Sequence, residues 1–235
     1  MDAPPEAAPV FGAALSLAER FAALLAGAGV ERGVIGPAEA SRIWDRHLLN
    51  CAAIVSLAPV DGWIADVGSG AGLPGVVLGM LLPAARVTLV EPLARRVAFL
   101  EECIADLELA NVEVRRARAE ELAGELAADM VTARAVAPLE KLAGLCAGLA
   151  RPGGLVVAMK GTNASRELAS AGPVLARLGV RDARVAQVGS ASGAAAATVV
   201  LFTVAGRAPR SGGGARGSRS HRQPGRARGG RDRWS

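Results

Sequence analysis

The sequence predicts an α/β fold built on a mostly parallel sheet with helices on both faces. Five short β-type runs alternate with helical stretches, a pattern typical of a doubly wound parallel sheet. A glycine-rich turn joins the first of these runs to the helix that follows it. Two further strand-like runs come last, separated only by a short turn-forming stretch. This spacing fits an antiparallel hairpin better than another crossover helix.

Each element can be placed along the chain. Apolar residues at helical spacing over residues 13–29 and 39–57 predict a helical extension before the sheet. The five parallel strands are expected at residues 63–67, 86–90, 112–116, 130–133 and 154–159, and the hairpin at 183–188 and 197–204. The intervening helices are expected at 73–82, 94–107, 119–126, 139–149 and 165–178, the last ending or kinking at Pro173.

The net charge of +5 is unevenly divided along the chain. From Gly206 onward there are nine arginines and one acid, whereas residues 1–205 carry slightly more acidic than basic side chains. A segment rich in Gly, Arg and Ser cannot bury enough apolar surface to offset its chain entropy, so residues 206–235 are expected to be disordered. The predicted organisation is therefore a helical extension over residues 1–60, an α/β domain over 61–205 and a basic tail.

Cysteine usage and hydropathy indicate a cytoplasmic protein with no metal and no membrane partner. Cys51, Cys103 and Cys146 are odd in number, widely spaced and without Cys-x-x-Cys spacing, so they are expected to be reduced thiols of the core. Residues 1–6 lack the basic start of a secretory signal. The apolar stretch 73–85 is interrupted by proline and glycine and is too short to cross a bilayer of about 30 Å.

The glycine-rich turn at residues 66–75 predicts a nucleotide-type cofactor. Gly68 and Gly70 let the backbone approach a ligand without interference from a Cβ atom. Residues 70–75 also match the Gly-x-Gly-x-x-Gly fingerprint, with Glu91 about 20 residues further on, so a nicotinamide-dependent oxidoreductase is one alternative. Asp66 directly before the glycines, together with the closing hairpin, favours S-adenosylmethionine. Glu91 ends the second strand, where a carboxylate can accept hydrogen bonds from both hydroxyls of a ribose.

Polar side chains follow the other strands as well. Because the carboxyl ends of parallel strands meet at one edge of the sheet, Glu120, Arg134 and Lys160 should lie near Asp66 and Glu91. An unpaired charge after a buried strand costs several kcal/mol, which favours a functional role for Arg134 and Lys160. The position of Glu120 at a helix start leaves a purely structural role open.

Several segments together resemble the RsmG (GidB) family of ribosomal RNA small-subunit methyltransferases, from about residue 42 to residue 204. The resemblance lies in segments 46–50, 66–75, 89–100, 132–135 and 159–161. It implies a class I, Rossmann-like methyltransferase fold and methyl transfer from S-adenosylmethionine to guanine N7 in the 530 loop of 16S rRNA. It also implies that the cofactor is bound by Gly68, Leu73, Ala119, Glu120 and Arg134.

The chain departs from the family pattern at two places. Asn50 and Cys51 stand where the family often has aspartate and serine, which leaves the role of this segment open. Glu91 stands where the family often has aspartate, and this change keeps the carboxylate.

Methylation at guanine N7 requires no general base, because N7 already presents a lone pair. Alignment of the reacting atoms, which can supply on the order of 7 to 11 kcal/mol, would then dominate catalysis. Lys160 is the one candidate catalytic residue. With three Trp, four Phe and no Tyr, the chain offers few surfaces for base stacking, so phosphate contacts are expected. The candidates for RNA binding are Arg42, Arg46, His47, Arg95 and Arg96.

Three alternatives stay open. His47 is equally interpretable as a structural hydrogen-bonding residue. The arginine tail either adds salt-sensitive attraction to RNA or is an inert solubilising segment. The protein as a whole could be a noncatalytic RNA-binding or ribosome-assembly factor. In each case the expected partner is 16S rRNA or the small ribosomal subunit, and the expected state is a monomer.

Overall fold

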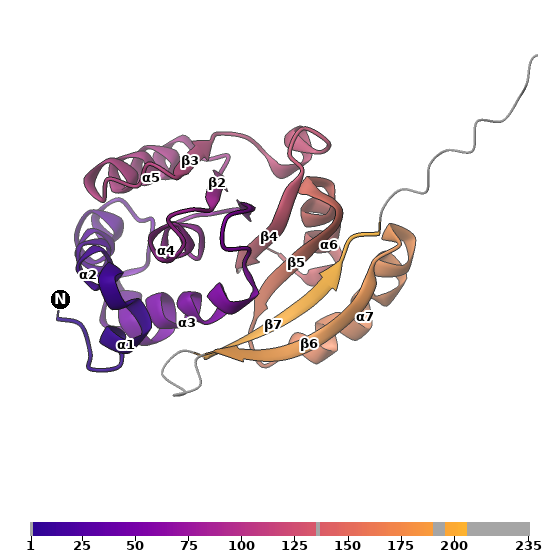
Figure 1. Ribbon diagram of the computed structural model, residues 1–235, viewed down its shortest axis with the longest axis horizontal. Coiled ribbons are helices and arrows are strands. Elements are labelled where there is room, and N and C mark those ends of the chain that lie inside the picture. The colour runs from indigo at the N-terminus through magenta and orange to yellow at the C-terminus, as the bar shows by residue number, and fades with distance from the viewer. Residues whose placement is uncertain (1, 135–136, 190–195, 206–235) are drawn as a thin grey trace, which may run out of the picture.

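The computed structural model describes residues 2–134, 137–189 and 196–205. Within these residues, seven strands form one sheet in the order β3-β2-β1-β4-β5-β7-β6 (Figure 1). The strands are β1 (Trp63–Val67), β2 (Arg86–Val90), β3 (Val112–Arg115), β4 (Ala128–Arg134), β5 (Ala150–Lys160), β6 (Arg181–Gly189) and β7 (Ala196–Thr203).

The sheet is parallel from β3 to β5, and β7 runs antiparallel to both of its neighbours. The predicted doubly wound sheet with a closing hairpin is therefore confirmed. From β1 the chain continues outward to β2 and β3 on one side, and it then returns to β4 on the other side. Such a reversal leaves a crevice at the carboxyl ends of the two central strands, which is where open α/β sheets bind ligands.

Alternate strand residues face two separate cores, as the period of two in a strand requires. Ile64, Met130 and Val157 point to the core shared with the N-terminal helices and with α4 (Gly75–Leu81) and α5 (Ala94–Asp106). Their neighbours Ala65 and Val131 point to the opposite core, shared with α6 (Leu139–Leu149) and α7 (Ala164–Leu178). Both faces of the sheet are therefore covered by helices.

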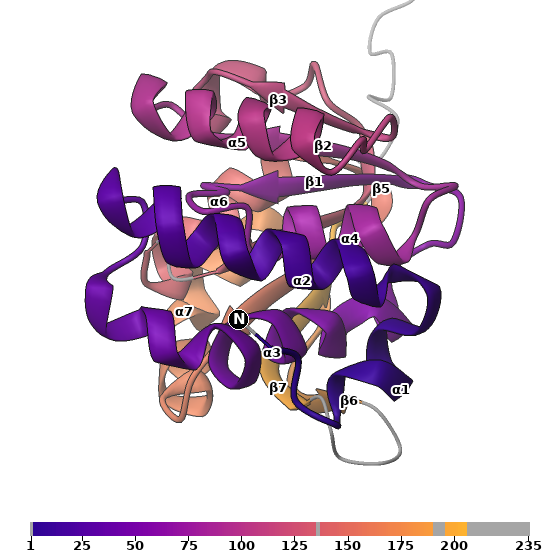
Figure 2. The ribbon, with the colours of Figure 1, turned by 90° about the vertical axis from the view of Figure 1, so that its left-hand side faces the viewer.

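The N-terminal helices pack over the first of these faces (Figure 2). They comprise α1 (Ala7–Phe11), η1 (Gly12–Ala14), α2 (Leu15–Leu24) and η2 (Leu25–Gly29), followed by η3 (Pro37–Arg42), η4 (Ile43–Leu48), α3 (Leu49–Ala52) and η5 (Ala53–Leu57). By length and composition the helical segment Ala7–Gly29 could cross a membrane, but a core helix of a soluble protein meets the same criterion. One side of this segment, including Phe11, Phe21 and Leu25, is buried against the rest of the molecule.

One sequence-based expectation about the helices is wrong. The helix expected at 119–126 is only a short 3-10 turn, η6 (Ala119–Leu122), because Gly124 adopts a positive φ of 81° and reverses the chain. Of the two outcomes expected at Pro173, an end or a kink, the end is excluded, because helix α7 continues to Leu178. Ala171 and Leu175 are buried on either side of the proline, so packing against the sheet holds the helix across the missing hydrogen bond.

Two predictions fall on residues outside these ranges. They are the disordered basic tail from residue 206 and most of the hairpin turn at residues 189–193.

Candidate cofactor site

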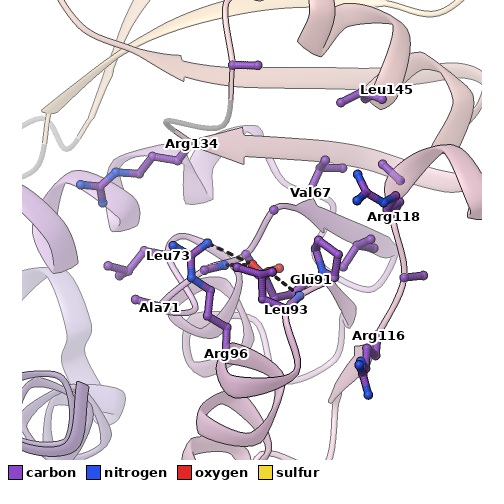
Figure 3. Close-up of a pocket in the computed structure, with 18 of the residues that line it drawn as sticks. Val67, Ala71, Leu73, Glu91, Leu93, Arg96, Arg116, Arg118, Arg134 and Leu145 are labelled. Carbon is purple, nitrogen blue, oxygen red and sulfur yellow. Dashed lines mark hydrogen bonds and ion pairs between the residues drawn. The ribbon is translucent and has the colours of Figure 1, made fainter. Parts of the chain in front are cut away.

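A cavity of about 900 Å³ opens at the carboxyl ends of β1, β2 and β4 (Figure 3). This volume lies within the range of small-molecule sites, about 300 to 1,000 Å³. Its walls come from the glycine turn after β1, the end of β2, the segment around η6, the start of α6 and the chain before η3. Of the predicted site residues, the cavity is lined by His47, Gly68, Gly70, Leu73, Glu91, Arg96, Ala119, Glu120 and Arg134.

The glycine turn forms the floor of this cavity. Gly68, Gly70 and Gly72 all have positive φ values, between 57° and 86°, which L side chains rarely adopt. The turn is tied to the next strand because the N–H of Gly68 donates to the carbonyl of Val90 over 2.8 Å. At Gly72 an added Cβ would also lie 2.6 Å from a methyl group of Val76. The backbone of this turn is therefore both fixed and accessible.

Asp66 lies behind the turn and does not reach the cavity wall formed by the described residues. Its side chain is fully buried, and one carboxylate oxygen accepts from the N–H of Gly75 over 3.0 Å. Burial raises the pKa of Asp66 to about 7. A Cβ at Gly75 would meet Leu89 at 2.2 Å, so the start of α4 lies directly against the strands. The geometry thus gives Asp66 a role in holding the turn, in place of the direct cofactor contact expected from the sequence.

Glu91 connects the end of β2 to the glycine turn. Its buried carboxylate accepts from the N–H of Gly70 and from the N–H of Leu93, each over 3.0 Å. Arg96 lies 3.7 Å from the same carboxylate. An ionised carboxylate offers about four lone-pair positions, and the two backbone donors leave capacity for the hydroxyls of a ribose. The site therefore fits an adenosyl cofactor, and the Glu91 carboxylate faces the cavity with acceptor capacity left over.

The far wall carries positive side chains that the sequence analysis did not single out. Arg116 and Arg118 follow β3, and Lys141 lies in the first turn of α6; all three are exposed and line the cavity. Figure 3 shows Arg116 and Arg118 on the side of the cavity opposite to Arg134. Their position after a strand end, beside Ala119 and Glu120, is the signal that could have found the two arginines.

The opposite wall is formed by the N-terminal extension. Val34, Ile35 and Gly36 line the cavity beside His47. No local sequence signal marks these three residues, because only the packing of the extension brings them to the sheet edge.

Arg134 lies at the end of β4 and is engaged with this extension. Its guanidinium donates to the Sγ of Cys51 over 3.1 Å and to the carbonyl of Arg46 over 3.2 Å, and it lies 2.5 Å from the Nδ1 of His47. The side chain lines the cavity, but its donors are directed at the N-terminal helices.

Lys160 does not line the cavity formed by the described residues, in contrast to its expected catalytic position. Its side chain is 7% exposed, pairs with Glu167 over 2.8 Å and donates to the carbonyl of Ala137 over 2.8 Å. Glu167 in turn accepts from the N–H of Leu139 over 2.9 Å. Lys160 therefore holds the start of α6 in place.

The other predicted RNA contacts are spread over the rim. Arg42 and Arg46 are exposed on the N-terminal extension, near Asp45 and Glu39 respectively, and neither lines the cavity. Arg95 is exposed on the first turn of α5, whereas Arg96 faces the cavity. Among the described residues, no group of three His, Cys, Asp or Glu side chains is placed to hold a metal ion.

Comparison with known proteins identifies the family. A family model described as rRNA small subunit methyltransferase G, GidB, matches residues 14–194. The chain belongs to the GidB family. The matched range begins within the helical extension and ends before β7, so most of the extension is part of what this chain shares with the family.

Named relatives are similar over almost their whole length. The ribosomal RNA small subunit methyltransferase G of Nocardioides sp. is 51% identical over 223 residues, covering 92% of this chain and 87% of the relative. The protein of the same name from Thermobifida fusca is 51% identical over 216 residues, covering 92% of this chain and 91% of the relative.

Solved structures support the fold. M. jannaschii TYW2, solved in complex with AdoMet, aligns with a TM-score of 0.52 at 16% identity, covering 68% of this chain and 76% of TYW2. A SAM dependent methyltransferase from Aquifex aeolicus aligns with a TM-score of 0.51 at 20% identity, covering 72% of this chain and 99% of the Aquifex protein. The predicted class I methyltransferase fold is therefore confirmed.

Proposed function

We propose that this protein transfers a methyl group from S-adenosylmethionine to guanine N7 in the 530 loop of 16S rRNA. The observation that carries the proposal is the coincidence of the GidB match with a cavity whose floor is the glycine turn and whose ribose acceptor is Glu91. The relatives that cover most of this chain bear the name ribosomal RNA small subunit methyltransferase G. The RNA partner is 16S rRNA, alone or within the small subunit.

Different cavity residues bind different parts of S-adenosylmethionine. When bound, this cofactor supplies an electrophilic methyl group. Glu91 accepts from the ribose, and the backbone at Gly68 and Gly70 allows close approach. Ala119 and Glu120 border the cavity beyond the end of β3, and Leu73 closes it above α4.

The residues facing the cavity suit a reaction without a general base. The Glu91 carboxylate is committed to two backbone donors, and the Nδ1 of His47 lies against Arg134. Because guanine N7 carries a free lone pair, neither residue needs to remove a proton. The chain contributes by holding the base in line with the methyl group.

Positive side chains around the cavity provide the phosphate contacts for RNA. Arg95, Arg116, Arg118 and Lys141 are exposed at or near the opening. Contacts of this kind position RNA without reading its sequence, and they weaken as salt rises. All the described residues that line the cavity come from one copy, so we propose that the protein acts as a monomer. We also propose that it acts in the cytoplasm, as the sequence predicts.

The direct test is mapping of modified nucleosides in 16S rRNA from cells with and without this protein. Loss of a single N7-methylguanosine in the 530 loop, restored by adding purified protein and S-adenosylmethionine to small subunits, is the expected result. An unchanged set of modifications would favour the noncatalytic assembly factor. Binding of NADH without binding of S-adenosylmethionine would favour the oxidoreductase.

A further inference from the structure

The side chain of Arg134, at the end of β4, is hydrogen-bonded to the N-terminal extension. All the hydrogen-bonding partners of the Arg134 guanidinium among the described residues lie on residues 46–51 of the extension. A guanidinium has five donors and no acceptor, so each partner must accept.

This requirement fixes the state of His47. Since Arg134 lies against Nδ1, that nitrogen must be the unprotonated acceptor, and the ring hydrogen must be on Nε2. Nε2 lies 2.9 Å from a carboxylate oxygen of Glu39, whose other oxygen accepts from Arg46 over 3.2 Å. Burial, and then the charge of Arg134, lower the pKa of His47, which agrees with a neutral ring at pH 7.

The position of Glu39 links this chain of contacts to the cavity. Glu39 lies on η3, which begins at Pro37, directly after the wall residues Val34, Ile35 and Gly36. At the other end of the wall, the N–H groups of Val34 and Ile35 both donate to the carbonyl of Gly29. The wall is therefore held at one end by η2 and at the other by the Glu39, His47 and Arg134 contacts.

We propose that His47 is a positioning residue for the cofactor: as an acceptor for Arg134 and a close neighbour of Glu39, with Nε2 at 2.9 Å from its carboxylate, it docks η3 and η4 on β4 and so holds the Val34–Gly36 wall. It acts on the cofactor through Arg134 and the wall. The inference rests on the proposed function because its main readout is the affinity for S-adenosylmethionine.

The same arrangement predicts that η3 and η4 lose their attachment to β4 at acidic pH. A second proton on His47 would be placed on Nδ1, where it faces the donors of Arg134. The charged groups facing the ring are Arg134 from β4, Glu39 from η3 and Arg46 from its own helical turn. Two of these three are cations, and the neighbouring Cys51 is buried with a pKa raised by burial, so the thiol supplies no compensating charge.

The experiment compares His47→Ala, His47→Asn and the control Asp45→Asn. The asparagine oxygen takes the position of Nδ1 and accepts from Arg134 but cannot titrate. Asp45 lies on the same helical turn, is 68% exposed and makes no contact with Arg134 among the described residues. For each variant, calorimetric titration with S-adenosylmethionine between pH 5.5 and pH 8 is combined with amide hydrogen exchange of residues 34–47 in the ligand-free protein.

The expected result is a roughly tenfold loss of affinity at pH 8 for His47→Ala, the usual effect of losing a hydrogen bond to a charged group. Its amides at residues 34–47 should exchange faster. His47→Asn should stay within about threefold of the wild type at pH 8. It should lack the decline in affinity that we expect for the wild type towards the acid end of the range, where His47, whose pKa is lowered by burial, takes up a proton. Asp45→Asn should follow the wild type throughout.

Unchanged affinity and exchange in His47→Ala would overturn the inference, and so would equal pH profiles for the wild type and His47→Asn. Asp66 is present in both of these proteins, so its titration cancels in the comparison. If His47→Ala fails to fold, the pH profile of His47→Asn decides. A wild type that does not bind S-adenosylmethionine would refute the proposed function, while the exchange measurements would still test the docking.

Discussion

Gly70 and Glu91 connect two neighbouring strand ends, with the Gly70 N–H donating to the Glu91 carboxylate over 3.0 Å. The contact joins the turn after β1 to the end of β2, so the residue proposed to accept the ribose also helps to set the conformation of the turn. A change at Glu91 should therefore affect the cofactor and the turn together.

Glu91→Gln should weaken binding of S-adenosylmethionine by tenfold or more. The glutamine amide would present a donor to one of the two backbone N–H groups, and a buried unmatched donor costs about 1 to 3 kcal/mol. Isothermal titration calorimetry measures the effect. Glu101→Gln, on the exposed side of α5, is the matched control and should bind as the wild type does. Equal affinity in the two variants would contradict the assignment of Glu91.

Gly75→Ala should destabilise the fold by about 1 to 3 kcal/mol, the usual cost of overpacking a core. The added methyl group would lie 2.2 Å from Leu89 and 2.7 Å from the carboxylate of Asp66. Gly144→Ala is the control, since Gly144 lies in α6 with nothing within 4 Å of the added atom. That variant should gain about 0.5 to 1 kcal/mol from helix propensity. Urea unfolding at pH 7 separates the two outcomes, and a stable Gly75→Ala would mean that α4 can move away from the sheet.

Asp66→Asn should change how stability depends on pH. Burial raises the pKa of Asp66 from 3.8 to about 7, so between these values the folded state binds the proton more tightly than the unfolded state. The contribution of Asp66 to the free energy of unfolding is therefore fully present below pH 4. It is lost as the pH rises through 7, at about 1.36 kcal/mol per pKa unit. Asparagine keeps an acceptor for Gly75 and removes the ionisation.

The stability of Asp66→Asn relative to the wild type should consequently increase from pH 4 to pH 8. The free energy of unfolding, measured in guanidinium chloride at several pH values, checks this difference. A constant difference across the range would show that the carboxyl ionises normally in the folded protein.

Lys160→Ala and Glu167→Ala test whether Lys160 is catalytic or positional. If Lys160 holds the start of α6 through Glu167, both variants should lose activity to a similar extent, and the double variant should be little worse than either one. We expect a coupling of about 1 to 2 kcal/mol in stability, because the ammonium is nearly buried. A loss of turnover in Lys160→Ala alone, with Glu167→Ala fully active, would restore the catalytic assignment.

The sheet was predictable because its signals are local. Buried parallel strands are short apolar runs between turn residues. For six of the seven strands, both the first and the last residue lie within two residues of the expected position. Strand β5 begins earlier, at Ala150, because residues 150–153 pair with the start of β4 and the end of β7. The order of the strands in space was not predicted, because strand pairing joins segments that are far apart in the sequence.

The sequence did not predict the surroundings of three site residues, because contacts between distant parts of the chain determine them. Lys160 follows a buried strand as a functional cation would, but its partner Glu167 lies one helix further on. Asp66 directly precedes the glycines, yet the close approach of Gly75 takes its carboxylate away from the cavity. From the sequence, His47 could equally be an RNA contact or a structural hydrogen-bonding residue, and its contact with Arg134 was not foreseeable.

The antiparallel direction of β7 decides where the arginine-rich extension begins. Thr203 is paired with Leu155 and Thr198 with Lys160, so the chain leaves the sheet at the edge remote from the cavity. The last described residues, Val204 and Ala205, therefore lie at the end of the sheet opposite to the cavity, and the 30 residues from Gly206 onward follow them in the sequence. Shortening the chain from Gly206 should therefore alter capture of the ribosomal RNA and leave the affinity for the methyl donor intact.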